Sequence, residues 1–268
     1  MSVTFLSIFA IILYIAAGWI LALRLSKQES QGSAWKSPVT LALIASGFHA
    51  YVLYKGFFTP QGINFGFVNA VSLLSWMIAL FIVIASYSKP VENLGIAIFP
   101  LAALAIILAW AFPSTHFLSM QEVSMLEAHI LISIIAYSFL SIAAVQAILL
   151  AIQDKHLHNQ HPGGFIRALP PLQTMETLMF QMIAMGFVLQ SFSLISGFIF
   201  LDDMFAQHLV HKTVLSILAW IIFAVLLWGR WRFGWRGKIA IRWTLGGFVS
   251  LLLAYLGSKM VLEIMLGR

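Results

Sequence analysis

Residues 3–25 read VTFLSIFAIILYIAAGWILALRL, and no charged side chain appears among them before Arg24. A helix needs about 20 mostly apolar residues to cross the hydrocarbon core of a membrane. This stretch is too long for the core of a signal peptide, and it has neither a basic start nor a small-residue cleavage site. We therefore expect it to be retained as a first membrane-spanning helix.

The same apolar character extends over the whole chain. Of the 268 residues, 61% are hydrophobic and 9% are charged, and the mean hydropathy is +0.97. Soluble domains carry about 25% charged residues, so a soluble fold would leave too much apolar surface in contact with water. The composition indicates an integral membrane protein. Cysteine is absent, which excludes disulfides, thiolate clusters, thioether attachment of haem and a cysteine nucleophile.

Further apolar runs of membrane length follow the first. They are continuous and lack the period-two alternation of barrel strands, which favours helices. Turn-forming residues separate them, as in the Thr59–Gly62 and His161–Gly164 segments. We predict an all-α, polytopic transmembrane helix bundle that forms a single domain over residues 1–268. Its roughly eight spans are expected at about 3–24, 37–57, 65–87, 93–112, 124–152, 176–201, 208–229 and 239–265.

Lysine and arginine are distributed unequally between the two sides of this map. One side carries eleven and the other four, which accounts for all 15. Because cytoplasmic loops are enriched in these residues, we predict that both termini face outward from a bacterial inner membrane. The net charge of +6 is explained by this orientation against anionic lipid. Nucleic acid is not an expected partner, since the basic residues are divided among short loops. The four outer residues are Lys55, Lys212, Lys259 and Arg268.

Three histidines, His49, His129 and His211, lie inside the predicted spans and toward the outer face. An imidazole in hydrocarbon is costly unless it has a partner, so an ionisable group within the membrane is a functional candidate. Three at a similar depth suggest one site.

His129 is the strongest of the three candidates. On a helix His129, Ser133 and Tyr137 follow one another at i, i+4 and i+8, so one polar stripe must face protein rather than lipid. Glu127 lies just outside this stripe. The structural alternative is a histidine whose hydrogen bond to a neighbouring helix only holds the helices together.

The other two histidines leave both interpretations open. His211 follows His208 on the same helical face, with Asp202 and Asp203 just upstream, a spacing that suits a divalent metal or a hydrated interfacial pair. His49 follows small residues at 45–47 that would let another helix approach closely, so a packing hydrogen bond is as plausible there as a ligand role.

A porphyrin is the ligand that best fits imidazoles from separate helices without cysteine. Haem iron accepts neutral imidazole, and the flat apolar ring suits a slot between helices. His129 and His211 are the expected iron ligands, with His49 as the alternative second ligand, and Lys55, Lys212 and Lys259 are the cations nearest to the propionates. The rival hypothesis is a zinc site, which requires all three histidines to converge on one point.

Two other segments have simpler explanations. The histidines of His156–His161 are interpreted as part of a solvated polar loop. The basic and aromatic segment Arg230–Lys238, RWRFGWRGK, is interpreted as a lipid-headgroup anchor. The chain has no phosphate-binding glycine loop and no nucleophile elbow, so nothing indicates an ATPase or a hydrolase.

Several segments together carry a resemblance to a known family. Leu126-Glu127-Ala128-His129 leads to Ala136-Tyr137, Ile195-Ser196-Gly197 precedes an outer segment, and Ala254-Tyr255-Leu256-Gly257 lies in the last span. With the basic turn Gly234–Lys238, these resemble the membrane haem-handling superfamily of cytochrome c assembly proteins, of the CcsA/CcmC type, and most closely its YpjD-type inner-membrane branch. The resemblance implies a helical membrane protein that handles haem, in which His129 corresponds to an outward-facing haem ligand.

The chain also departs from the family pattern. Residues 201–211 contain no tryptophan where the family has a tryptophan-rich segment, and Trp228 stands where a membrane histidine is expected. A second outer histidine is missing from residues 257–268, so only His129 carries over by position; the YpjD-type branch shares these losses. We expect a binding or carrier protein rather than an enzyme, with haem, membrane lipid and other membrane proteins of cytochrome c maturation as partners. The alternative is a non-haem transporter or accessory subunit whose histidines are structural.

Overall fold

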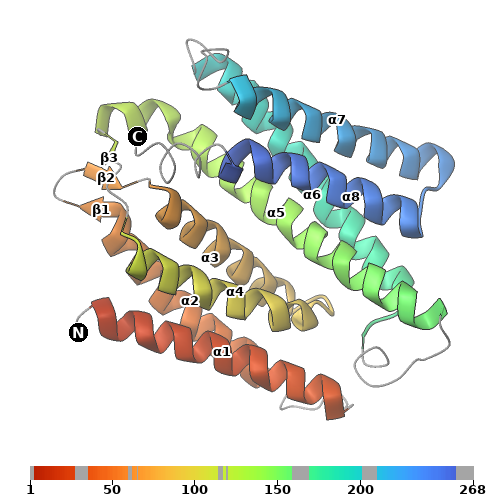
Figure 1. Cartoon of the computed structure of the whole chain (residues 1–268), viewed down its shortest axis with the longest axis horizontal. Coiled ribbons are helices and arrows are strands. Elements are labelled where there is room, and N and C mark those ends of the chain that lie inside the picture. Colours follow the sequence, from red (N-terminus) through yellow and green to blue (C-terminus); the bar gives the residue numbers. More distant parts are fainter. Residues whose placement is uncertain are drawn as a thin grey trace. The chain divides into compact units, whose positions relative to one another are not determined.

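A computed structural model describes the chain in eight stretches separated by short gaps. The described chain is almost entirely helical and separates into two compact units (Figure 1). Unit 1 contains four helices and three short strands, and unit 2 contains the long helix that follows and the three helices after it. The described residues are 3–27, 36–59, 62–64, 66–113, 117–118, 120–158, 169–200 and 210–257.

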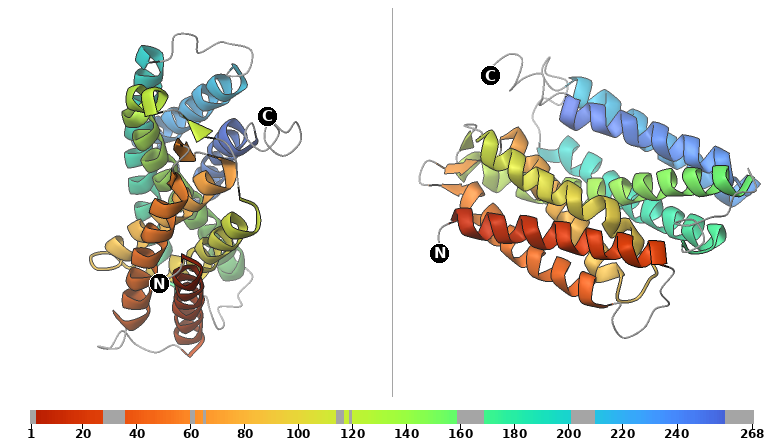
Figure 2. Two further views of the ribbon diagram at one scale, coloured as in Figure 1. Left: turned by 90° about the vertical axis from the view of Figure 1, so that its left-hand side faces the viewer. Right: turned by 60° about the horizontal axis from the view of Figure 1, so that its bottom comes forward.

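The four long helices of unit 1 form a bundle. Helix α1 packs against α2 and α4, and α3 packs against the same two helices (Figure 2). Small residues permit the close approach: a Cβ added to Gly18 of α1 would lie 3.2 Å from Cδ of Pro100 in α4. Close packing through small residues is typical of helices in membranes. The helices are α1 (Val3–Lys27), α2 (Lys36–Phe57), α3 (Phe67–Ala85) and α4 (Gly95–Ala111), the last preceded by the 3₁₀ turn η2 (Glu92–Leu94).

A small antiparallel sheet, which the sequence analysis did not predict, lies at one end of unit 1. Its order is β1-β2-β3, with Phe58 opposite Ile63 and Ile63 opposite Leu118. Strands of two or three residues are too short to show the alternation by which a strand is recognised in sequence. The strands are β1 (Phe58–Thr59), β2 (Gly62–Asn64) and β3 (Phe117–Leu118).

The first helix of unit 2 is α5, which has 39 residues. At 1.5 Å per residue α5 is about 58 Å long, well beyond the roughly 30 Å hydrocarbon core of a bilayer. A Cβ added to Gly186 of α6 would lie 2.6 Å from the Leu140 side chain of α5, so glycine permits this helix contact. Helix α7 packs along both α6 and α8. The elements are α5 (Met120–His158), α6 (Leu172–Phe200), α7 (Val210–Phe233), α8 (Gly237–Leu252) and a final π-helical turn, η4 (Leu253–Gly257).

Eight helices within the described residues are long and apolar enough to cross a membrane. The predicted all-α bundle with about eight spans is therefore confirmed. Large apolar side chains such as Trp19 and Trp110, each 65% exposed, lie on the outside of the helices, as expected for surfaces in contact with lipid. The orientation of the termini and the single domain remain predictions. The far end of the last span, predicted to reach 265, lies outside the described residues.

A tight turn connects α7 to α8. Gly234 and Gly237 have φ angles of +67° and +53°, in the left-handed region that favours glycine. The ring of Trp235 lies against Gly229, where an added Cβ would be 2.4 Å from a ring carbon. The two positive φ angles and the absence of a side chain at Gly229 allow the turn to fold back on α7.

The interpretation of the segment Arg230–Lys238 as a lipid-headgroup anchor is wrong for Arg230. Its guanidinium donates a hydrogen bond of 2.8 Å to Oε1 of Glu176 in α6 and one of 3.1 Å to the carbonyl of Trp235. Its guanidinium also lies 4.7 Å from the ring centre of Phe180. Arg230 therefore fastens the turn to α6. Trp231, which is 82% exposed, has the position expected of a headgroup contact.

Candidate functional site

His129 lies in α5 and faces α6. Its Nδ1 is 3.0 Å from the backbone carbonyl oxygen of Ser193 and 3.0 Å from Oγ of Ser196. Because a carbonyl oxygen only accepts hydrogen bonds, Nδ1 carries the ring proton in this arrangement. Nε2 of the neutral ring then presents a lone pair, and within the described chain no hydrogen bond to it is found.

The polar stripe of α5 faces protein, as predicted. Ser133 donates a hydrogen bond of 2.6 Å to the carbonyl of His129, and its Oγ lies 2.7 Å from Oγ of Ser193. One helical turn further, the Tyr137 hydroxyl donates to the carbonyl of Leu251 at 2.9 Å. The stripe therefore connects α5 to both α6 and α8.

Two segments that carry the family resemblance lie against each other. The ring centres of Tyr137 and Tyr255 are 5.5 Å apart. Tyr255 belongs to η4, and the carbonyl of Leu251 that accepts the Tyr137 hydrogen bond lies where α8 gives way to this π-helical turn. Single π-helical turns within helices often occur at functional sites. Through Tyr137, this irregular turn meets the polar stripe of α5 that begins at His129.

The α6 partners of His129 were not predicted from the sequence. The decisive acceptor is a main-chain carbonyl, which has no sequence signature. The available signal was the three-residue spacing of the two serines, which places them on one helical face. The hydroxyl of Ser196 also donates to the Ser193 carbonyl at 2.9 Å. This hydrogen bond holds together the two oxygen atoms that lie 3.0 Å from Nδ1 of His129.

His211 lies at the same end of unit 2 as His129. Gln190 of α6 donates to the carbonyl of Ser216 in α7 at 3.0 Å, and this contact sets the antiparallel register of the two helices. Continued along α6, the register places Ser196 level with the first turn of α7, which carries His211. The His211 side chain is exposed. Among the described contacts, none joins it directly to His129.

His49 belongs to unit 1, where its side chain is fully buried. Its Nε2 lies 2.9 Å from Oγ of Ser72 in α3, and the edge of its ring meets Tyr14 of α1 at a centroid distance of 5.9 Å. Nδ1 has no hydrogen-bond partner among the described residues. These contacts connect three helices of unit 1, as the packing interpretation of His49 requires.

The other candidates from the sequence are the outer lysines and the residues that could bind a metal ion. Lys55 lies 5.9 Å from the ring centres of both Tyr51 and Tyr54. Lys212, next to His211, already interacts with another residue. Within each unit, the described residues contain no group of three His, Asp or Glu side chains placed to hold a metal ion. His208, Asp202, Asp203, Lys259 and the side chain of Glu127 lie outside the described residues.

The interpretation of residues 156–161 as a loop is wrong for its first half. Helix α5 continues to His158, and Nδ1 of His156 lies 2.9 Å from the carbonyl of Ile152 within the same helix. His161 lies outside the described residues.

The comparisons with known proteins agree with this architecture. Residues 37–266 match the family model described as cytochrome C assembly protein. The chain belongs to this family. It is 31% identical to the inner membrane protein YpjD of Escherichia coli K12 over 261 residues, which cover 96% of this chain and 98% of that protein. The predicted resemblance to the family and to its YpjD-type branch is confirmed, and the protein is a multi-pass protein of the inner membrane.

More distant relatives share part of the chain. Protein HemX of Brevibacillus brevis is 20% identical over 77% of this chain and 80% of its own length. The cytochrome c biogenesis protein CcsA of Chlamydomonas reinhardtii is 26% identical over 52% of this chain and 38% of its own length. No solved structure gives a significant match.

Proposed function

We propose that this protein binds haem in unit 2, near the outer membrane face, with His129 as an axial ligand of the iron. The hydrogen bond from Nδ1 of His129 to the Ser193 carbonyl carries the proposal, because it leaves the Nε2 lone pair available. Histidines that bind metals almost always donate the N–H of the other ring nitrogen to a carbonyl, carboxylate or water, which fixes the ring and raises its basicity. Neutral imidazole is a common axial ligand of haem iron.

The residues around His129 fit a porphyrin. Phe192, Ile195 and Ile199 of α6 are 55%, 55% and 69% exposed. By helical periodicity they lie on the face of α6 adjacent to the one that carries Ser193 and Ser196. This apolar strip suits the flat, hydrophobic ring of haem beside a histidine ligand. Bound haem would supply the iron centre that a cytochrome c assembly protein handles.

The second axial position is proposed for His211, because it lies at the same end of unit 2 as His129. His49 belongs to unit 1, where its Nε2 lies within hydrogen-bond distance of Ser72, so it is not part of the site proposed for unit 2. Lys212, next to His211 in the first turn of α7, is the proposed partner of a propionate, since carboxylates form charge-assisted hydrogen bonds with ammonium groups. Some relatives are named as cytochrome c biogenesis proteins. We therefore assign the proposed haem site to that process, with other membrane proteins of cytochrome c maturation as partners.

Haem content tests this proposal. The wild type, His211→Ala, His49→Ala and the control His156→Ala would be purified in mild detergent, and haem per protein would be measured after titration with haemin. The wild type is expected to show a Soret band of low-spin haem. His211→Ala is expected to shift this spectrum to high spin, with roughly tenfold weaker binding. His156→Ala should match the wild type, because the His156 ring lies at the opposite end of α5.

His49→Ala is the comparison from unit 1, and it is expected to keep the low-spin spectrum of the wild type. Loss of this spectrum in His49→Ala but not in His211→Ala would contradict the assignment of His211. If no purified form takes up haemin, the haem proposal fails, and the accessory role with structural histidines would replace it. Uptake that is equal in all four proteins would remove His211 from the site.

A further inference from the structure

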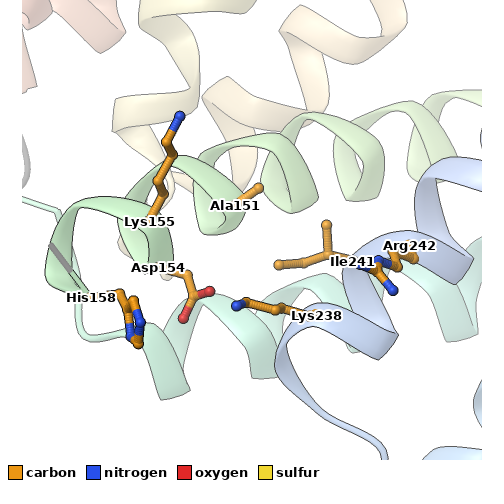
Figure 3. Close-up of a pocket in the computed structure, with 7 residues that line it drawn as sticks. All are labelled: Ala151, Asp154, Lys155, His158, Lys238, Ile241 and Arg242. Atoms are coloured by element: carbon orange, nitrogen blue, oxygen red, sulfur yellow. The ribbon is translucent and has the colours of Figure 1, made fainter.

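A pocket of about 310 Å³ opens between the last turns of α5 and the first turns of α8, at the end of unit 2 opposite His129 (Figure 3). We propose that it binds the phosphate of an anionic phospholipid. This inference is independent of the proposed haem site, which shares no residue with it. Three cationic side chains and one carboxylate line the pocket, which gives a formal charge of +2 with His158 neutral: Lys155, Lys238, Arg242 and Asp154.

The cations of the pocket are available to a ligand. Among the described residues, none of the three forms an ion pair; the described ion pairs are those of Arg230 and Arg236 with Glu176. Figure 3 shows the Lys238 ammonium on the same side as the Asp154 carboxylate and the His158 ring, whereas Lys155 extends away from them. Lys238 and Arg242 lie on adjacent turns of α8 and are therefore the main candidates for contact with an anion.

The first turn of α8 adds to the positive electrostatic potential of the pocket. This helix of 16 residues begins at Gly237, and its N-cap residue, Arg236, provides no side-chain cap for the first backbone N–H groups. Uncapped N–H groups at a helix N-terminus carry a partial positive charge and bind phosphate well. Lys238 belongs to this first turn, so its ammonium and the helix terminus favour the same anion.

The surroundings of the pocket favour a lipid phosphate over a dissolved one. The pocket lies at the ends of two membrane spans, His129–His158 and Gly237–Tyr255. Trp235 precedes α8 and Trp243 follows Arg242 on it; their rings lie 5.6 Å apart, and tryptophan concentrates at the level of lipid headgroups. Ile241 and Ala151 form the apolar part of the lining. A phospholipid would place its phosphate on the cations and its acyl chains along the spans.

Native mass spectrometry of the full chain in mild detergent tests the proposal, with dioleoyl phosphatidylglycerol as the probe and dioleoyl phosphatidylcholine as the zwitterionic comparison. Wild-type protein is expected to retain phosphatidylglycerol more tightly. Lys238→Gln/Arg242→Gln is expected to weaken its binding by about tenfold or more, since each cation near an anionic headgroup is worth about fivefold. Asp154→Asn is expected to tighten binding several-fold, a gain that misfolding does not produce.

The matched control is Arg24→Gln/Lys89→Gln, which removes one arginine and one lysine from unit 1, outside the pocket. It should bind phosphatidylglycerol within about twofold of the wild type. Equal losses in the two double variants would overturn the pocket, and so would an unchanged affinity in Asp154→Asn. Displacement of phosphatidylglycerol by millimolar inorganic phosphate from the wild type would assign the pocket to free phosphate and overturn the lipid.

Discussion

Replacing His129 by alanine is expected to weaken haem binding by at least about tenfold and to remove the low-spin Soret band of the purified protein. Loss of a partner that only orients a metal-bound histidine already costs about 10–100-fold in affinity, so loss of the ligand itself should cost no less. Haemin titration followed by absorption would measure the change.

Ser196→Ala serves as the graded comparison for His129→Ala. It removes one acceptor from Nδ1 but keeps the Ser193 carbonyl, so the ring remains oriented. We expect haem affinity between those of the wild type and His129→Ala. Equal affinity in His129→Ala and the wild type, with the helix content of both preserved, would show that the iron is bound elsewhere.

The second large effect concerns the turn between α7 and α8. Glu176→Gln is expected to lower the free energy of unfolding by about 2 kcal/mol, because it leaves Arg230 and Arg236 without the carboxylate that they share. Removal of one member of a fully buried pair costs about 3–5 kcal/mol. The Arg230 side chain is 28% exposed, so solvent reduces the loss here. Unfolding in mixed micelles of a mild detergent and SDS would measure it.

A double-mutant cycle separates this ion pair from general damage to the turn. Glu176→Gln/Arg230→Gln should lose less stability than the sum of the two single variants, since the double variant leaves neither member of the pair as an unpaired charge. Arg232→Gln, which removes an exposed arginine of the same turn, should change stability by less than about 0.5 kcal/mol. Additive losses in the cycle would contradict a direct contribution from the Glu176–Arg230 pair.

Much of the fold follows from the sequence because lipid imposes a simple rule. A spanning segment must satisfy its backbone internally, so long apolar runs such as residues 3–25 predict helices directly. The stripe of His129, Ser133 and Tyr137 was predictable for a related reason, since polar groups at helical spacing within a span must meet protein. The structure confirms the first helix and the contact of the stripe with protein, which is made with α6 and α8.

The remaining features depend on pairings that the sequence does not encode locally. Glu176 and Arg230 are 54 positions apart, and neither residue type indicates the other, so the sequence predicts a lipid-headgroup anchor at Arg230 instead of an ion pair. Lys155, Lys238 and Arg242 form a pocket only because the last turns of α5 meet the first turns of α8. The acceptor that sets the ring proton of His129 is a backbone carbonyl, a group that every residue carries.

Chemical rescue of His129→Gly tests most directly whether Nε2 of His129 binds haem iron. The variant would be loaded with haemin in mild detergent, and its absorption spectrum recorded while imidazole is added. Ligation by His129 predicts a high-spin spectrum without imidazole and a return to the wild-type low-spin spectrum as imidazole fills the space of the lost side chain. A wild-type spectrum from His129→Gly before any imidazole is added would contradict it.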